Sequence, residues 1–388
     1  MKKNRDTTVF RYPALVLLAL LLFGFTAVNL LWPKREISAL ENRKLAQIPA
    51  VTLTGLLDGS WAKDFGSYLQ DQIAFRDGWI DLECDANTLL FQKAEEGDIL
   101  LGRDGWMFTK QFGLSDATRK QMDKNVASLV TFAQRHPGHV TFLLAPSAST
   151  IYPEELPVGA PMIDENALLD RIFSAVSPYA GVLDLRRTFT ENKQDYLYYK
   201  TDHHWTTQGA YLAYRQFCGL LGLTPFDAAA HEAAQVPDFY GTHYSTARWW
   251  AVQPDTITYY PQDAGMTIYQ ANSETDFSAL NTENLINTAK FATRDKYAAF
   301  LDGNNGYSVI EGRGQGGILV VKDSYANCFV PFLTENYAKI GVIDFRNFSY
   351  GLDALMESEG YDQVLVLYNF QTYISDTKAY NISRPSSK

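Results

Sequence analysis

The sequence predicts an α/β protein in which helices cover both faces of a parallel sheet. From about residue 99 onward, short runs rich in Val, Ile and Leu alternate with segments of helical periodicity. This alternation is typical of strands joined by crossover helices, and strands that are apolar throughout are buried on both faces. The composition, 46% hydrophobic and 20% charged, is that of a globular protein with an ample core.

The N-terminal segment has the length and composition of a membrane-spanning helix. Residues 12–32 carry no charge, and several basic residues lie in the preceding tail, 1–11. Twenty-one residues at about 1.5 Å each span roughly 30 Å, the thickness of one hydrocarbon core. The positive-inside rule leaves the tail in the cytoplasm and exports the remainder. We therefore expect a single-pass anchor in the cell membrane and an extracytoplasmic domain. A cleaved signal peptide is the alternative, although no A-x-A site follows the apolar run.

Two further regions follow the anchor. Residues 33–98 are predicted to be a connector that becomes helical, because apolar residues recur at helical spacing between 61 and 91. Residues 99–388 are predicted to form the α/β domain, which opens with a hairpin at 99–108. Between about 224 and 300 the alternation of strands and helices fails. Short runs such as TITYY and MTIYQ indicate an inserted, partly β segment there.

The expected elements of the α/β domain alternate in chain order. Pro137 and Gly138 stop the first helix, and threonine caps at 206 and 207 begin the third, which ends near Gly222. The predicted strands are 139–145, 181–185, 316–321, 340–345 and 363–370. The predicted helices are 116–136, 166–179, 206–222, 326–337 and 352–360.

Charge and cysteine content exclude several classes of protein. The net charge is −10 and no basic stripe occurs, which argues against a nucleic-acid partner. The three cysteines, Cys84, Cys218 and Cys328, lie far apart in the sequence and form no C-x-x-C pair. A disulfide scaffold and a structural zinc site are therefore not expected.

A serine stands where a predicted strand gives way to a helix. Ser324 follows Lys322 and Asp323, directly after the apolar strand at 316–321. Reactive groups of open α/β sheets lie at the carboxyl ends of strands, where the first N–H groups of a helix can stabilise an oxyanion. The alternative is that Ser324 only caps the helix, a contribution of about 1 kcal/mol.

The stretch TDHHW at 201–205 contains the acid and the base that a serine nucleophile requires. Asp202 and His204 are two residues apart, so their side chains can meet if the loop curls. The second ring nitrogen of His204 is then left to face Ser324. The alternative is a helix cap surrounded by buried aromatic residues, which accounts for the same residues without a catalytic role.

A metal site is the third interpretation of this stretch. Asp202, His203 and His204 are competent ligands, and His231 or His243 can add another. The H-x-H and H-x-x-x-H spacings are absent, however, and adjacent histidines rarely point at one ion. We therefore expect the site to use no metal and no cofactor.

Several stretches together resemble a known family. TDHHW followed by T-x-x-G-A resembles the signature of the DHHW protein family, and it is similar to the D-x-H-W-T-x-x-G-A stretch of alginate O-acetyltransferase proteins. The family order also includes SALENRKLAQIP, FGSYLQDQIAFR, LLGRDGWMF, LLAPSASTIYPE and VVKDSYANCF. The resemblance implies an SGNH hydrolase-like, flavodoxin-like three-layer fold. It also implies a catalytic triad of Asp202, His204 and Ser324 in permuted order, with the serine last.

The resemblance also implies a function, and the sequence itself offers candidates for the rest of the site. The function is O-acetyl transfer to a cell-surface or secreted polysaccharide. The acetyl groups would come from a membrane-bound O-acyltransferase (MBOAT-type) partner. The alternatives are a carbohydrate acetylesterase and a non-catalytic polysaccharide-binding or assembly protein. The candidate oxyanion donors are Asn327 and Tyr325, and the candidate substrate-binding residues are His203, Trp205, Tyr244, Arg248 and Arg346.

Overall fold

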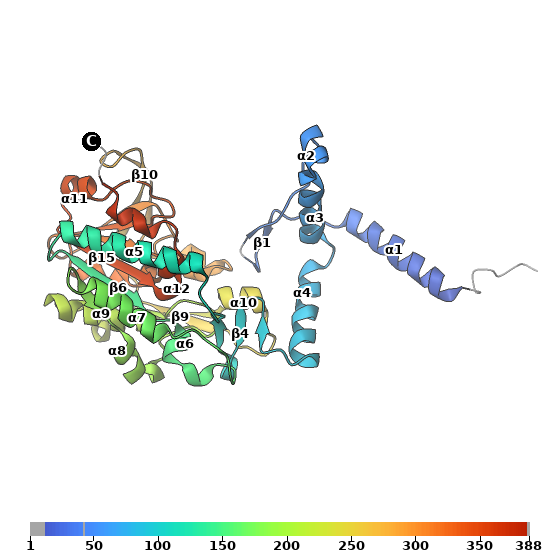
Figure 1. Ribbon diagram of the computed structural model, residues 1–388, viewed down its shortest axis with the longest axis horizontal. Helices are drawn as coiled ribbons and strands as arrows, with labels where there is room; N and C mark the ends of the chain where they lie inside the picture. Colours follow the sequence, from blue (N-terminus) through green and yellow to red (C-terminus); the bar gives the residue numbers. More distant parts are fainter. Residues whose placement is uncertain (1–11, 42, 386–388) are drawn as a thin grey trace, which may run out of the picture. The chain divides into compact units, whose positions relative to one another are not determined.

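The computed structural model describes residues 12–41 and 43–385, which fall into two units, one up to Gln92 and one from Lys93 onward (Figure 1). The basic tail predicted at 1–11 lies outside the described residues. In the first unit, α1 (Pro13–Leu31) is long and apolar enough to cross a membrane, and Pro13 occupies its first turn, where no N–H partner is needed.

The remainder of the first unit is a small hairpin followed by helices. The helical expectation for 61–91 is confirmed, with a break at 73–75, where Phe75 adopts a left-handed backbone conformation. Ion pairs between Arg43 and Asp71 and between Arg76 and Glu41 hold the hairpin to the helices. The elements are β1 (Ile37–Ser38), β2 (Arg43–Lys44), α2 (Leu53–Asp58), α3 (Ser60–Gln72), α4 (Arg76–Asp85) and a π-helical turn (Ala86–Leu90).

The second unit is built on an eight-stranded sheet in the order β11-β10-β12-β14-β13-β15-β6-β7. The five strands from β14 to β7 are parallel, as predicted, whereas β12, β10 and β11 extend the sheet antiparallel. The inserted segment therefore contributes two strands to the main sheet. The strands are β6 (Val140–Ala145), β7 (Gly181–Leu183), β10 (Gly265–Ala271), β11 (Phe277–Asn284), β12 (Tyr307–Glu311), β13 (Gly317–Lys322), β14 (Lys339–Ile343) and β15 (Gln363–Asn369).

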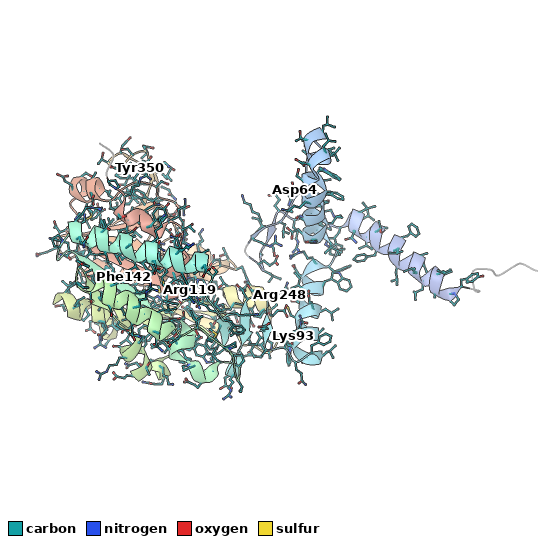
Figure 2. The ribbon with its side chains drawn as sticks, in the orientation of Figure 1. Asp64, Lys93, Arg119, Phe142, Arg248 and Tyr350 are labelled. Atoms are coloured by element: carbon teal, nitrogen blue, oxygen red, sulfur yellow. The ribbon has the colours of Figure 1, made fainter. Side chains whose placement is uncertain are left out.

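Helices cover both faces of this sheet, because every parallel strand carries apolar side chains on its two sides. One face packs against α5 (Asp116–Arg135), α7 (Glu165–Val176), α11 (Asp353–Glu359) and α12 (Phe370–Ser375). Phe142 of β6, which is labelled in Figure 2, belongs to this layer. Its ring lies near those of Phe173 and Tyr373. The other face packs against α9 (Thr207–Leu221) and the turns after β13.

Smaller elements complete the second unit. They include the predicted hairpin, β4 (Ile99–Leu101) and β5 (Met107–Thr109), with β3 (Glu95–Glu96) beside it. The remaining elements are α6 (Ala148–Ile151), α8 (Arg186–Glu191), α10 (Thr242–Ala247) and the hairpin of β8 (Ala234–Phe239) and β9 (Asp255–Tyr259). Six further 3-10 turns are η3 (Arg103–Gly105), η4 (Pro153–Glu155), η5 (Lys193–Asp195), η6 (Ala228–Ala230), η7 (Thr288–Ala292) and η11 (Ala379–Ser383).

The helix predicted at 326–337 is wrong in type. The segment instead forms two 3-10 helices, η9 (Ser324–Cys328) and η10 (Val330–Glu335). Pro331 explains the break, because its ring nitrogen cannot donate the hydrogen bond that an α-helix needs at that position.

Candidate active site

Ser324 is placed by the turn that follows β13. Asp323 caps η9, since one oxygen of its carboxylate accepts a hydrogen bond from the backbone N–H of Tyr325 at 2.9 Å. Its other oxygen accepts from the backbone N–H of Asn369, the last residue of β15, at 2.8 Å. Capping by Ser324 itself, the alternative considered from sequence, is therefore not what the turn uses. The Ser324 hydroxyl is left to meet another partner, and that partner is His204.

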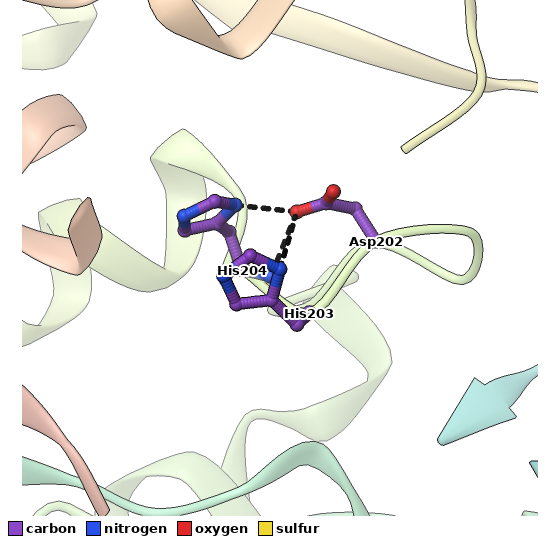
Figure 3. Close-up of side chains that lie close together, drawn as sticks. All are labelled: Asp202, His203 and His204. Atoms are coloured by element: carbon purple, nitrogen blue, oxygen red, sulfur yellow. Dashed lines mark hydrogen bonds and ion pairs between the residues drawn. The ribbon is translucent and has the colours of Figure 1, made fainter. Parts of the chain in front are cut away.

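The loop 201–206 curls as the spacing of Asp202 and His204 requires. One oxygen of Asp202 accepts from the backbone N–H of His204 at 2.9 Å and lies 2.5 Å from its Nδ1 (Figure 3). His204 Nε2 lies 2.8 Å from Ser324 Oγ. With the Nδ1 proton assigned to the bond with Asp202, Nε2 is free to accept the serine proton. The structure thus brings the three side chains into one hydrogen-bonded line.

The second oxygen of Asp202 is held from the inserted segment. It accepts from the backbone N–H of Thr242 at 2.7 Å and from the Thr242 hydroxyl at 3.1 Å. Burial opposes ionisation of Asp202, but the neighbouring imidazoles and these hydrogen bonds outweigh it, so the pKa of Asp202 lies well below its ordinary value. Asp202 is therefore a fixed anion beside His204.

Asp255, the first residue of β9, anchors the start of the loop. Its carboxylate accepts from the backbone N–H groups of Lys200, at 3.1 Å, and Thr201, at 2.8 Å. It also accepts from the Thr201 hydroxyl at 2.6 Å and from the Tyr196 hydroxyl. Four donors on one buried carboxylate fix the backbone immediately before Asp202.

Two rings lie against the imidazole of His204. The Tyr297 ring is stacked on it, with centroids 3.8 Å apart and planes 14° apart. The His203 ring also has its centroid 3.8 Å away, tilted by 38°. His203 Nδ1 lies 2.7 Å from the Thr242 hydroxyl. Burial, and then the charge of a protonated His204, lower the pKa of His203, so this ring is neutral when His204 accepts a proton.

The three residues Asp202, His203 and His204 also offer ligand atoms within 4.8 Å of one another. A cation bound at His204 Nδ1 would displace the proton that this nitrogen shares with Asp202, so a metal site and the Asp–His pair are alternatives. The further ligands considered from sequence are engaged elsewhere. His243 Nε2 lies 3.0 Å from the Thr109 hydroxyl, and His231 Nδ1 lies 2.9 Å from the carbonyl oxygen of Asp227.

The two oxyanion candidates occupy different surroundings. Among the described residues, the Asn327 amide bonds to Lys322, at 2.7 Å, and more weakly to Gly303 and Asn304. Within the part of the chain that the structure describes, no hydrogen bond joins the Asn327 amide to Ser324. Tyr325 follows Ser324 directly, and its hydroxyl donates to the carbonyl oxygen of His203. Burial raises the pKa of Tyr325 well above its ordinary value, so this hydroxyl stays protonated.

The substrate-binding candidates lie in varied surroundings. Trp205 is fully buried and donates from Nε1 to the carbonyl oxygen of Tyr325 at 2.8 Å, so it packs the loop against η9. Tyr244 is partly buried against the hairpin residues, and Arg248 is buried at the end of α10. Arg346 is the most exposed, with 42% of its side chain accessible, and Asp344 holds its guanidinium at 2.5 Å.

Cys328 has the character of a buried apolar residue, as expected. Burial raises the pKa of its thiol to about 12, so the reactive thiolate is absent at neutral pH. The site residues that sequence reasoning missed include Thr242, Asp255 and Tyr297. All three come from the irregular segment between 224 and 300, where no periodicity or motif marks them.

Comparison with known proteins identifies relatives in sequence. Residues 166–343 match the sequence model of a family described as DHHW protein. A curated protein named probable alginate O-acetylase AlgJ, from Pseudomonas syringae pv. tomato, is 25% identical over 170 residues. That match covers 42% of this chain and 43% of the relative, so the chain aligns with less than half of the relative's length.

Solved structures share the fold. A DHHW family protein from Eubacterium siraeum has a TM-score of 0.61 at 22% identity, covering 75% of this chain and 96% of that one. Bacillus cereus PatB1, in a structure with a sulfonyl adduct, has a TM-score of 0.59 at 19% identity, covering 74% and 99%. The predicted α/β architecture, with a parallel sheet and an inserted, partly β segment, is confirmed. The chain is thus similar to the DHHW protein family over a stretch that contains Asp202, His204 and Ser324, as the motifs predicted.

Proposed function

We propose that this protein is a membrane-anchored, extracytoplasmic O-acetyltransferase that modifies a cell-surface or secreted polysaccharide. The observation that supports the chemistry most is the 2.8 Å distance from His204 Nε2 to Ser324 Oγ, with Asp202 on the other ring nitrogen. The name of the curated relative, a probable alginate O-acetylase, supports acetyl transfer to a polysaccharide as the class of reaction.

The first half-reaction acetylates the serine. His204 Nε2 takes the proton of Ser324, and Oγ forms a bond to the carbonyl carbon of an acetyl ester. The bond from that carbon to the donor oxygen then breaks, and the donor leaves as an alcohol with the proton from His204. Asp202 stabilises the intervening imidazolium. The backbone N–H of Ser324 is the expected oxyanion donor, because the N–H groups of Tyr325 and Ala326 already bond to Asp323.

The second half-reaction returns the enzyme to its starting state. His204 takes a proton from a sugar hydroxyl, whose oxygen attacks the acetyl carbon, and Ser324 Oγ leaves and recovers the proton. Exclusion of water favours transfer to the sugar, whereas entry of water gives acetate and makes the protein an esterase.

The proposed location rests on α1. One spanning helix has no means of moving an acetyl group across a bilayer, so a multispanning O-acyltransferase of the MBOAT type is the proposed source of the donor. Deleting 12–32 is expected to release the protein from the membrane fraction into the soluble fraction. Retention in the membrane fraction would overturn the proposed anchor.

Purified full chain with an acetyl ester donor and candidate oligosaccharides tests the chemistry. Mass spectrometry is expected to find acetyl on Ser324 under turnover and on the glycan afterwards, with both lost in Ser324→Ala. Release of acetate without acetylated glycan would make the protein an esterase. Glycan binding that persists in Ser324→Ala, with no acetyl on wild-type serine, would support the binding or assembly alternative.

A further inference from the structure

Tyr297 contacts both members of the proposed proton-transfer pair. It lies in η8 (Lys296–Ala299), at the end of the inserted segment, and is 3% exposed. Its ring is stacked on the His204 imidazole, and its hydroxyl lies 3.2 Å from the carbonyl oxygen of Ser324 and 3.2 Å from Cys328 Sγ. One side chain therefore touches the ring that takes the proton and the turn that carries the serine.

The hydroxyl is a permanent donor in this position. Burial raises the pKa of Tyr297 well above its ordinary value, so the group keeps its proton at neutral pH. A single proton serves two acceptors, the carbonyl oxygen of Ser324 and the sulfur of Cys328, and both belong to η9. The hydroxyl consequently fixes the start of η9 relative to the tyrosine ring.

The two rings on His204 occupy opposite faces. Two rings with centroids 3.8 Å from the same imidazole would collide if they shared one face. His203 therefore covers one face and Tyr297 the other. The edge of the imidazole carries its two hydrogen bonds, to Asp202 at Nδ1 and to Ser324 at Nε2. Rotation of the ring out of the line between Asp202 and Ser324 is blocked on both sides.

We propose that Tyr297 is a positioning residue that aligns His204 with Ser324 by stacking on the base and tying its hydroxyl to the serine turn. This inference rests on the proposed function, because the alignment matters only if His204 removes the serine proton. Displacements of about 1 Å at such a pair cost up to roughly a hundredfold in rate, so a residue that sets this distance has a measurable effect.

Three variants of the full-length protein separate the two contacts. Tyr297→Phe keeps the stacked ring and removes the hydroxyl, whereas Tyr297→Leu removes both. Tyr259→Leu is the matched control, because that tyrosine belongs to the same inserted segment and its ring packs on Phe291. The first readout is the rate at which a fluorophosphonate labels Ser324. We expect a fall of roughly tenfold to a hundredfold in Tyr297→Leu, a smaller fall in Tyr297→Phe and no change in the control.

The second readout does not depend on reactivity. In histidine-labelled protein, with the His204 signal assigned through His204→Gln, the imidazole C–H resonances are expected to move downfield in Tyr297→Leu and to stay in Tyr297→Phe. The ring current of an aromatic ring stacked on the imidazole face holds these resonances upfield, so loss of the ring moves them downfield. General loosening of the fold does not produce this shift selectively at His204. If Tyr297→Leu fails to fold, the labelling rate of Tyr297→Phe alone tests the proposal, and a wild-type rate in that variant would overturn it.

The outcomes distinguish this inference from the proposed function. Wild-type rates and unmoved resonances in Tyr297→Leu, with acetyl transfer intact, would overturn the positioning role and leave the function standing. Labelling that depends on Tyr297 in a protein that transfers no acetyl group would support the positioning role and count against the transferase. A wild-type serine that neither labels nor becomes acetylated would overturn both.

Discussion

Replacing Gly241 with alanine is expected to disable the site without a change to any of its reacting groups. The glycine has ordinary backbone angles, so its role is not conformational freedom. A Cβ at this position would lie 2.1 Å from Asp202 Cβ and 2.3 Å from Asp202 Oδ2. Carbon atoms pack at about 3.5–4.0 Å, so the aspartate or its loop has to move by more than about 1 Å.

The size of the effect follows from what that movement breaks. Asp202 receives Thr242 N–H on one oxygen and both His204 bonds on the other, so its displacement turns the imidazole away from Ser324. Misplacement of about 1 Å costs roughly a hundredfold in rate. Overpacking at a buried position also lowers the free energy of unfolding by about 1–3 kcal/mol. The fluorophosphonate labelling rate of Ser324 and chemical denaturation measure the two effects separately.

Gly219→Ala is the matched control for this substitution. Gly219 lies inside α9, and a Cβ there meets nothing within 4 Å. Alanine is more favourable than glycine in a helix by about 1 kcal/mol, so this variant is expected to gain stability and to keep the wild-type labelling rate. A Gly241→Ala protein that folds and labels at the wild-type rate would refute the assignment of Asp202 as the group that orients His204.

Three further predictions concern buried charge and metal. Burial raises the pKa of Glu165 from 4.5 to about 7, so folding stability falls as pH rises through this window. Glu165→Gln removes that fall, and denaturation at pH 5 and pH 8 is expected to show a relative gain of up to about 3 kcal/mol at the higher pH. Lys322→Met leaves the buried carboxylate of Asp344 with Arg346 alone, and the free energy of unfolding is expected to drop by about 2–4 kcal/mol. Exhaustive chelation is expected to leave Ser324 labelling within about twofold, because the proposed proton transfer uses side chains only; a loss restored by Zn²⁺ would favour the metal alternative.

The contact between Asp202 and His204 could be predicted from the sequence because the interaction is local. An aspartate commonly accepts from the N–H two residues on, and that bond, at 2.9 Å here, is what curls the loop. The site of Ser324 followed from the rule that reactive groups lie at the carboxyl ends of parallel strands. No local pattern links two segments so far apart in the sequence. The expectation that Ser324 approaches His204 therefore drew on the family motifs as well.

The groups that hold the loop could not be predicted in the same way. Gly241, Asp255 and Tyr297 lie in a segment without helical or strand periodicity, and each acts through one contact with a distant residue. A glycine that admits a carboxylate looks like any other glycine in the sequence. The same limit applies to η9 and η10, where apolar spacing indicated one helix and the ring of Pro331 divided it.

The two adjacent histidines can serve the proposed proton transfer only if His203 stays neutral when His204 is protonated. When His204 takes the serine proton it becomes a cation, and a second cation 3.8 Å away would oppose that step. Burial and the presence of His204 both lower the pKa of His203, and the Thr242 hydroxyl satisfies its Nδ1 without adding charge. Asp202 lies closer to His204, at 2.5 Å, than to His203, at 3.7 Å. The carboxylate therefore stabilises the proton on the ring that faces Ser324, and the neighbouring ring contributes its surface rather than its basicity.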